Sequence, residues 1–255
     1  MQFKVQGHSD STLHIETCNN VSLVVKESSD FRLLDSIKKQ SEFKSNYFKT
    51  PPIHDVCIDK SVLYKMDYVN GYSFFEFLNL CSKNDLDFLI SKLNGYFNET
   101  IKDTEKIEIN TFADKMRKIG FLDNYNYIFD GLDYIKVFTG KCHGDMTLSN
   151  MIFKNNDIYL IDFLDSYLES PTLDLVKLRQ DTHLYWSFNM IDMKKSDILK
   201  SKIALKYIDD WIVGEYDIQN YKTLQTINLL RILPYATDTR IKTFIYSNIK
   251  MLWQN

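Results

Sequence analysis

Residues 143–150 read His-Gly-Asp-Met-Thr-Leu-Ser-Asn, and this stretch decides how the rest of the chain is interpreted. Twelve residues after Asn150, an apolar run ends in Asp162. The segment therefore offers a carboxylate, then an amide, then a second carboxylate. This order suits phosphoryl transfer from a nucleotide, because Asp145 can orient an attacking hydroxyl while Asn150 and Asp162 hold the magnesium ion that bridges the phosphates.

The composition of the chain disfavours several other kinds of protein. Its 255 residues, 44% of them apolar, suffice for one large domain or two joined lobes, and a net charge of -3 gives no basic surplus for nucleic acid. No apolar run approaches the roughly 18 residues of a membrane span. The four cysteines lack paired spacing and the first residues lack a signal-peptide pattern. We therefore expect a cytoplasmic protein that binds neither nucleic acid nor membrane, with its oligomeric state left open.

The first quarter of the chain is predicted to be rich in β-structure. β-favouring side chains gather in three short runs, at residues 13–16, 21–26 and 62–69. Between the second and third runs, Phe31, Leu34 and Ile37 recur at helical spacing, behind Ser29 or Asp30 as the capping residue. We therefore expect one helix, over about residues 30–44, among these strands.

The remainder of the chain is predicted to be mainly helical. Apolar residues recur at helical spacing over residues 86–97, behind a capping box of Ser82 and Asp85. A β-hairpin is expected around the turn at residues 154–157. Helices are also expected on both sides of Pro234 and over residues 196–214, where one broad apolar face contains Ile198, Leu199, Ile203, Leu205, Ile208 and Ile212. This order implies an α+β protein of two lobes.

These motifs resemble those of the aminoglycoside phosphotransferase and choline kinase family, which comprises small-molecule kinases with a protein-kinase-like fold. The catalytic loop HGDxxxxN of that family is matched by residues 143–150, and its ID[FW] metal motif by Ile161-Asp162-Phe163. Weaker matches, all in family order, are the P-x-x-D-L segment at Pro171–Leu175, the hinge at Met66–Gly71 and the lysine strand at Val24–Lys26.

The resemblance implies an architecture and an activity. A small β-rich lobe, residues 1–69, would bind the nucleotide, and a larger helical lobe with a catalytic β-hairpin, residues 70–255, would bind the acceptor. The protein would be an enzyme that uses Mg²⁺ and ATP, or GTP, to phosphorylate a hydroxyl of a small molecule such as an amino sugar, a sugar or a choline-like alcohol. The alternatives are a non-catalytic nucleotide-binding relative and a protein kinase. Gly144 in place of arginine and the lack of an Ala-Pro-Glu segment disfavour the protein kinase.

The resemblance also assigns roles to single residues. Asp145 is expected to be catalytic, and Asn150 and Asp162 are expected to bind the metal. Each could be explained singly as a turn or strand cap, but their shared spacing favours chemistry. The nucleotide is expected to contact Lys26, Ser9, Ser11, Asp67, Tyr68 and Val69. His143 is expected to brace the loop, and Asp174 either to cap a helix or to order the loop. The partner of Lys26 is left open among Glu42, Asp35 and Gln40.

The acceptor is only weakly indicated. Aromatic and acidic residues follow the metal motif at Tyr167, Glu169, Asp181, Tyr185 and Trp186. Together they would suit a cationic acceptor. Tyrosine and tryptophan at helical spacing are nevertheless more often part of a core, and this second interpretation is favoured.

Overall fold

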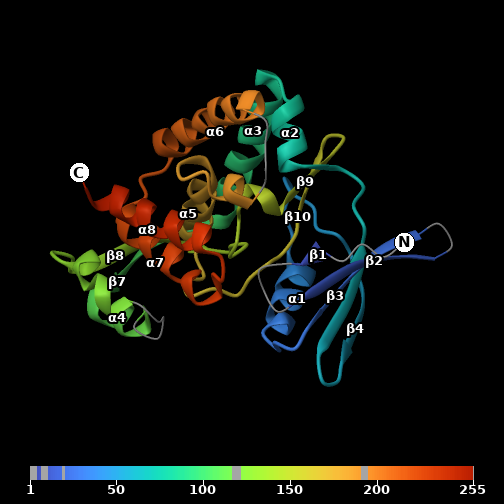
Figure 1. Cartoon of the computed structure of the whole chain (residues 1–255), viewed down its shortest axis with the longest axis horizontal. Helices are drawn as coiled ribbons and strands as arrows, with labels where there is room; N and C mark the ends of the chain where they lie inside the picture. The colour runs from blue at the N-terminus through green and yellow to red at the C-terminus, as the bar shows by residue number, and fades with distance from the viewer. Residues whose placement is uncertain (1–4, 7–10, 19–20, 117–121, 191–194, 255) are drawn as a thin grey trace. The chain divides into compact units, whose positions relative to one another are not determined.

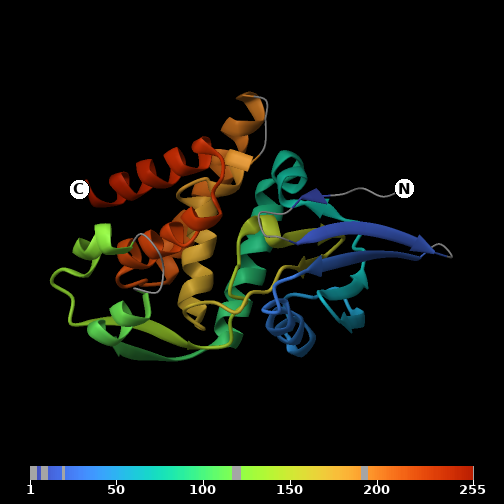
Figure 2. The ribbon, with the colours of Figure 1, turned by 60° about the horizontal axis from the view of Figure 1, so that its bottom comes forward.

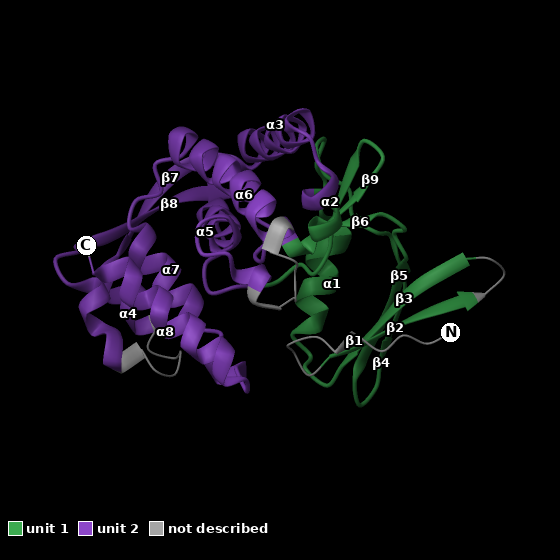
Figure 3. Ribbon diagram, turned by 45° about the horizontal axis from the view of Figure 1, so that its top comes forward, with its two compact units in different colours: residues 1–77, 149–165 green, residues 78–148, 166–255 purple. Residues whose placement is uncertain are grey.

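The computed structural model of the chain describes residues 5–6, 11–18, 21–116, 122–190 and 195–254. It divides into two compact units, which Figure 3 colours separately: unit 1 comprises residues 1–77 and 149–165, and unit 2 comprises residues 78–148 and 166–255. Unit 1 is built on antiparallel sheets, whereas unit 2 is built mainly of helices. The predicted α+β class, with a small sheet-based part and a larger helical part, is therefore confirmed.

Unit 1 is organised around a five-stranded antiparallel sheet in the order β1-β2-β3-β5-β4 (Figure 1). Its strands are β1 (Val5–Gln6), β2 (Thr12–Cys18), β3 (Val21–Ser28), β4 (Ile53–Ile58) and β5 (Val62–Asp67). Within this sheet Lys26 lies opposite Tyr64. The three predicted strand regions are confirmed, with the last one ending two residues early at Asp67.

Helix α1 (Leu33–Glu42) packs on this sheet through a small apolar cluster. Leu33 and Ile37 contact the cluster that Val62, Tyr64 and Met66 contribute from β5. The predicted helix is confirmed, but Phe31 is 49% exposed because it precedes the first helical turn.

A second sheet of unit 1 contains the predicted hairpin. Its strands are β6 (Tyr72–Ser73), β9 (Met151–Lys154) and β10 (Asp157–Leu160), in the order β10-β9-β6. Asn155 closes the turn with a φ of 55°, a left-handed conformation that asparagine tolerates better than most residues. The hairpin between Asn150 and Asp162 is therefore as expected, and it lies in the unit that contains Lys26.

Unit 2 is a helical assembly. Its helices are α3 (Lys83–Thr100), α4 (Ile109–Met116), α5 (Pro171–Thr182), α6 (Lys195–Glu215), α7 (Tyr221–Leu230) and α8 (Thr239–Trp253); α2 (Phe74–Leu80) spans the boundary between the units in sequence. Short 3-10 helices are η1 (Leu122–Phe129), η2 (Leu148–Asn150), η3 (Trp186–Met190) and η4 (Leu233–Tyr235). The Ser82–Asp85 capping box opens α3 as predicted. Among the described residues, no helix has the length and apolarity needed to span a bilayer.

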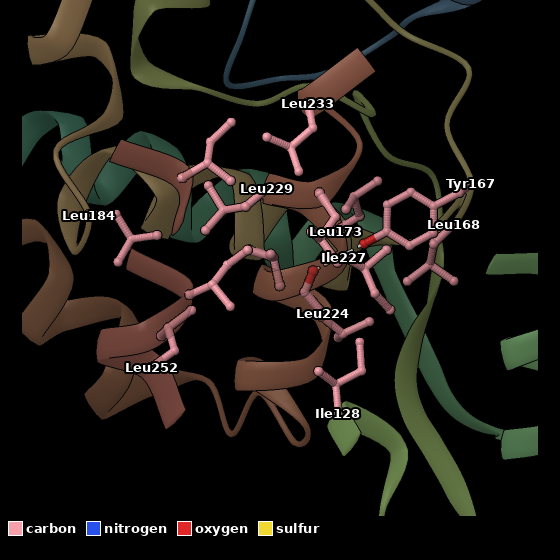
Figure 4. Packing of buried hydrophobic residues seen from close by; sticks show 14 of the residues in the cluster. Ile128, Tyr167, Leu168, Leu173, Leu184, Leu224, Ile227, Leu229, Leu233 and Leu252 are labelled. Atoms are coloured by element: carbon pink, nitrogen blue, oxygen red, sulfur yellow. Dashed lines mark hydrogen bonds between the residues drawn. The ribbon is translucent and has the colours of Figure 1, made fainter. Parts of the chain in front are cut away.

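The core of unit 2 surrounds α5 and α7. Figure 4 shows Leu173 from α5 gathered with Leu224, Ile227 and Leu229 from α7. Both helices are buried almost all round, which is typical of helices inside a core and not at its surface. Because α5 is packed on nearly all sides, we expect its side chains to be held in fixed positions.

One ribbon of unit 2 was not predicted. Strands β7 (Ile101–Glu108) and β8 (Tyr134–Gly140) pair antiparallel beside α4 (Figure 2). Strand β7 reads Ile-Lys-Asp-Thr-Glu-Lys-Ile-Glu and is mostly exposed, so it has no apolar alternation that would indicate a strand.

The predicted apolar face of α6 is wrong in part. Leu205, Ile208 and Ile212 are buried, but Leu199 is 64% exposed and Ile203 is 65% exposed. Leu199 stands nine residues, or about two and a half turns, before Ile208, so the two side chains point to opposite sides of the helix. The six apolar residues do not share one face.

Candidate active site

The loop at residues 143–148 is held by a buried carboxylate of α5. Asp174, fully buried, accepts hydrogen bonds from the His143 N–H at 2.6 Å and the Gly144 N–H at 2.8 Å. It also accepts one from the Tyr96 hydroxyl at 3.2 Å. Burial and the nearby Asp174 carboxylate raise the pKa of Tyr96 well above its ordinary value, so this hydroxyl remains a donor. The expected loop-ordering role of Asp174 fits these contacts.

Glycine is required in this loop. Gly144 has a φ of 89°, a left-handed conformation that a side chain would strain. The left-handed backbone at this position thus explains why the loop has Gly144 where the protein-kinase motif has arginine.

A second carboxylate of α5 holds the other end of the loop. Asp181 accepts from the Leu148 N–H at 2.7 Å, the Ser187 N–H at 3.0 Å and the Ser187 hydroxyl at 2.6 Å. Burial raises the pKa of Asp181, with a further increase from the charge of Asp145, while these donors oppose the shift. Asp181 is therefore committed to holding the loop.

Asp145 itself is paired with a lysine that the sequence analysis missed. The Nζ atom of Lys177 lies 2.9 Å from Asp145 Oδ1, and the Lys177 side chain is only 9% exposed against 29% for Asp145. The Asp145 N–H donates to Nδ1 of His143, which is fully buried and so is structural, as expected. Lys177 follows Asp174 by three residues on a helix, and this spacing could have indicated it.

In unit 1, Lys26 and Asp162 form an ion pair. Lys26 Nζ lies 2.6 Å from Asp162 Oδ1, and the two side chains are 16% and 40% exposed. Asp162 has a φ of 59°, which is rare for a residue other than glycine and typical of functional sites. The Asn150 carbonyl accepts the Ile161 N–H at 3.1 Å, so the backbone of Asn150 is tied to the residue before Asp162.

Asp162 was not one of the three partners considered for Lys26. Of those, Gln40 is buried and donates to the Pro51 carbonyl at 3.0 Å. Asp35 and Glu42 are exposed. Beside the ion pair, burial raises the pKa of Tyr64 to about 12. The charge of Lys26 has a smaller lowering effect on this pKa, and the charge of Asp162 a smaller raising effect.

The segment between β5 and β6 offers limited backbone chemistry for a base. The Asp67 N–H donates to the Pro52 carbonyl and the Tyr68 N–H to the Ser22 carbonyl, both at 3.0 Å. Two of the three residues of this segment expected to contact the nucleotide therefore have their N–H groups already hydrogen-bonded within unit 1. Of the two N-terminal residues expected to contact the nucleotide, Ser9 lies outside the described residues and Ser11 is half-buried just before β2.

A cavity of about 730 Å³ adjoins the same segment. Its lining includes Asp67, Tyr68 and Val69 together with residues that follow α1 and residues of the β9–β10 hairpin. Lys26 and Asp162 are not among the described residues that line it. A nucleotide that contacts Val69 as well as Lys26 and Asp162 would therefore have to extend beyond this cavity.

The residues considered for a cationic acceptor are engaged in packing and loop support. Tyr167 is buried, and its ring lies 4.7 Å from the Arg231 guanidinium. Glu169 accepts the Ser166 N–H at 2.7 Å, while Asp181 holds the loop as described. The core interpretation, favoured from the sequence, therefore fits Tyr167 better than an acceptor site does.

The described residues hold no group of three or more His, Cys, Asp or Glu side chains suited to a metal ion. The Asn150 and Asp162 pair is compatible with Mg²⁺ nevertheless. This ion prefers oxygen ligands and commonly takes only one or two carboxylates, completing its shell with phosphates and water. Asp162 is accessible enough for that role at 40% exposure.

Comparisons with known proteins bear on the fold that contains these residues. The model of the ecdysteroid kinase-like family matches residues 60–178. No curated protein matches the chain. In a solved structure of a thermostable mutant of aminoglycoside phosphotransferase APH(4)-Ia with ADP and hygromycin B, the similarity covers 100% of this chain and 95% of that chain, with a TM-score of 0.61 and 9% identity.

Two further structures extend the likeness. A protein assigned as a fructosamine-3-kinase from Haemophilus somnus 129PT has a TM-score of 0.58 at 8% identity, over 100% of this chain and 91% of that chain. The streptomycin-ATP complex of APH(2")-IIa has a TM-score of 0.54 at 16% identity, over 98% and 91%. The resemblance to small-molecule kinases with a protein-kinase-like fold is thus confirmed.

Proposed function

We propose that this protein is a phosphotransferase that moves the γ-phosphoryl group of ATP to a hydroxyl of a small molecule. The observation that carries the proposal is the Lys26–Asp162 ion pair, formed by a lysine and a left-handed aspartate of one unit. A nucleotide needs a cation for its phosphates and oxygen ligands for its metal. Residues 1–69 would supply most nucleotide contacts, and residues 70–255 the acceptor site.

Asp145 would orient the acceptor. An unperturbed aspartate, with a pKa of about 3.9, is a weak base, but phosphoryl transfer has a loose transition state in which alignment outweighs early proton removal. The acceptor oxygen bonds to phosphorus as the bond to the leaving ADP breaks. The proton of the hydroxyl passes to Asp145, which holds that hydroxyl in line.

The nucleotide would be held by groups of unit 1. Asn150 and Asp162 would bind Mg²⁺, which when present neutralises charge on the phosphates it bridges. The Lys26 ammonium would contact phosphate oxygens, and Val69 would hold the base through its backbone N–H. Because these base contacts are backbone groups, they leave ATP and GTP open. ADP and ATP in the complexes of two similar folds support a nucleotide.

We propose only the general class of the acceptor, a small molecule that has a hydroxyl group. Hygromycin B and streptomycin occupy two of the similar folds, and both are hydroxylated amino-sugar compounds, but Glu169 and Asp181 of this chain are already hydrogen-bonded. A cationic acceptor is therefore one class among several. Cys57 and Cys81 are free thiols, which supports a reducing compartment such as the cytoplasm.

A transfer screen with a matched variant tests the proposal. Purified protein would be incubated with MgATP and choline, ethanolamine, aminoglycosides, amino sugars or simple sugars, with ADP release and product mass as readouts. We expect one class to gain a phosphate, and Asp145→Asn to lower turnover by about 10²–10⁴ with MgATP affinity retained. Asp157→Asn, which changes a carboxylate paired with Lys49 on the hairpin surface, should behave as the wild type.

The same experiment decides between the proposal and its main rival. Near-wild-type turnover of Asp145→Asn would contradict the role of that residue. Tight MgATP binding without transfer to any acceptor would favour a non-catalytic nucleotide-binding protein. Asp145, Asn150 and Asp162 are all present in the chain, which favours the enzyme, because a binding protein has no need of the first.

A further inference from the structure

Helix α5 holds the loop at residues 143–148 through three charged side chains on one face. Asp174, Lys177 and Asp181 are spaced three and four residues apart, so they project from the same side of the helix. Asp174 binds the start of the loop and Asp181 its end. Lys177, between them, reaches Asp145 in the middle of the loop.

Lys177 differs from its two neighbours in what it contacts. The two aspartates bind backbone N–H groups, and these contacts fix the path of the loop. They do not fix the carboxylate of Asp145, whose terminal torsion is soft in any aspartate. The Lys177 ammonium, 2.9 Å from Asp145 Oδ1, contacts the carboxylate itself and so constrains its orientation.

The burial of Lys177 indicates a purpose beyond stability. Its side chain is 9% exposed, and removing an ammonium group from water is costly even when it is paired. Apolar residues of similar size at such positions often leave a protein as stable or more so. A buried ion pair that includes the reacting carboxylate is therefore better explained by the chemistry of that carboxylate.

We propose that Lys177 is a positioning residue for phosphoryl transfer, which fixes the carboxylate plane of Asp145 and offsets its charge. This inference rests on the proposed function. Asp145 must lie close to a phosphoryl group that is itself negative, and two like charges at short range repel. The ammonium of Lys177 reduces that repulsion while the carboxylate still orients the acceptor hydroxyl.

The first test separates positioning from binding. In Lys177→Gln and Lys177→Met, which remove the charge, we expect kcat to fall about 10–100-fold, as small misplacements at a reacting centre do. MgATP affinity should stay within a factor of about two. Lys177→Arg, which retains the charge, should recover most of the lost turnover. Lys206→Met, on the exposed face of α6 beside Asp210, is the matched control and should leave kcat unchanged.

The second test shows whether Lys177 acts through Asp145. In the Asp145→Asn background, Lys177→Gln should cause no further loss of turnover, because the group that it positions is gone. An equal loss in both backgrounds would overturn the proposal, as would unchanged kcat in Lys177→Gln and Lys177→Met. If Lys177→Met does not fold, Lys177→Gln and Lys177→Arg decide the matter.

The outcomes separate the two proposals. Wild-type transfer with a normal Lys177→Gln variant would overturn only the role of Lys177. Absence of transfer by the wild type to every acceptor would overturn the proposed function and this inference with it. A fall in kcat that Lys177→Arg restores, and that disappears in the Asp145→Asn background, would support both.

Discussion

Asp162 is proposed to bind the metal ion of the nucleotide, and its backbone has a strained, left-handed conformation. Left-handed backbone at a residue other than glycine costs on the order of 1–3 kcal/mol, so the surroundings must impose it. Contacts within unit 1 hold this part of the chain, among them the 2.6 Å ion pair with Lys26 and the packing of the next residue, Phe163, against Phe43 with ring centroids 5.0 Å apart. The carboxylate is therefore held in place before any ligand arrives.

Replacing Asp162 should separate metal-dependent nucleotide binding from folding. We expect Asp162→Ala to lose the Mg²⁺-dependent part of ATP affinity, because the variant lacks the carboxylate proposed to hold the ion. Calorimetric titration with ATP, with and without Mg²⁺, measures this effect. Asp157→Ala, on the hairpin that precedes Asp162 and 41% exposed in its pair with Lys49, should bind MgATP normally. Unchanged MgATP affinity in Asp162→Ala would contradict the metal role.

The sequence could indicate some residues of the site but not their partners. Asp145, Asn150 and Asp162 were visible because their spacing within one short segment matches a known motif. The ion pair of Lys26 joins residues 136 positions apart, and no local pattern encodes such a contact. Lys177 is an intermediate case. Its spacing from Asp174 on the helix can be read from the sequence, but its pairing with Asp145 depends on tertiary packing.

His183 should make stability depend on pH. Burial, followed by the charge of Arg179, lowers the pKa of His183, against a weaker opposite effect of Asp209. The folded state thus binds a proton less readily than the unfolded chain, whose histidine has a pKa of about 6.5. Stability from this residue is therefore present above about pH 6.5 and is lost as pH falls through the lowered folded pKa.

The measurement for His183 is the unfolding midpoint between pH 7.5 and 5. The wild type should lose more stability over this range than His183→Gln, because glutamine does not titrate. The two proteins should converge in slope above pH 7, which serves as the internal control. Parallel curves over the whole range would show that His183 contributes nothing to acid sensitivity.

Local turn chemistry explains which elements were predictable. The β9–β10 hairpin was foreseen because its turn, residues 154–157, lies between two short apolar runs. The β7–β8 ribbon was missed because it pairs Ile101 with Gly140, far apart in sequence, and because β7 is charged and exposed. Its pairing follows from tertiary packing that periodicity does not report.

Two glycines should respond oppositely to alanine. A Cβ at Gly71, just before β6, would lie 2.6 Å from the Phe153 carbonyl oxygen and 2.9 Å from Ile152 Cγ2. We expect Gly71→Ala to destabilise the protein by about 1–3 kcal/mol, because backbone in β9 must shift. Gly214, within α6, has nothing within 4 Å of its added Cβ, so Gly214→Ala should stabilise by about 0.5–1 kcal/mol through helix propensity.

Chemical denaturation of the two glycine variants and the wild type measures the change. The pair is informative because the substitution is the same and only the surroundings differ. A neutral Gly71→Ala would show that the close approach of residue 71 to β9 does not limit this turn. Destabilisation by Gly214→Ala would contradict the helix-propensity argument for α6.

Two apolar clusters of the described residues lie in different units, while other buried apolar residues such as Leu89, Leu93 and Ile212 belong to neither. In unit 2 one large cluster joins side chains from η1, β8, α5, α7 and α8. In unit 1 a smaller cluster joins α1 to β5 through Leu33, Ile37, Val62, Tyr64 and Met66. No residue belongs to both clusters as described. Because burial of apolar surface is the main favourable term in folding, each unit has its own source of stability.

Because the two clusters lie in different units, we expect a substitution in one cluster to reduce the stability of its own unit most. Leu224 of α7 is fully buried in the cluster of unit 2, so Leu224→Ala should cost about 2–5 kcal/mol. By hydrogen exchange, α5, α7 and α8 should lose protection while β3 and β5 keep theirs. Ile203→Ala, at a position 65% exposed on α6, should change stability by less than about 0.5 kcal/mol. Equal loss of protection in β3 and β5 would instead mean that both units unfold as one cooperative body, in which the smaller core depends on the larger.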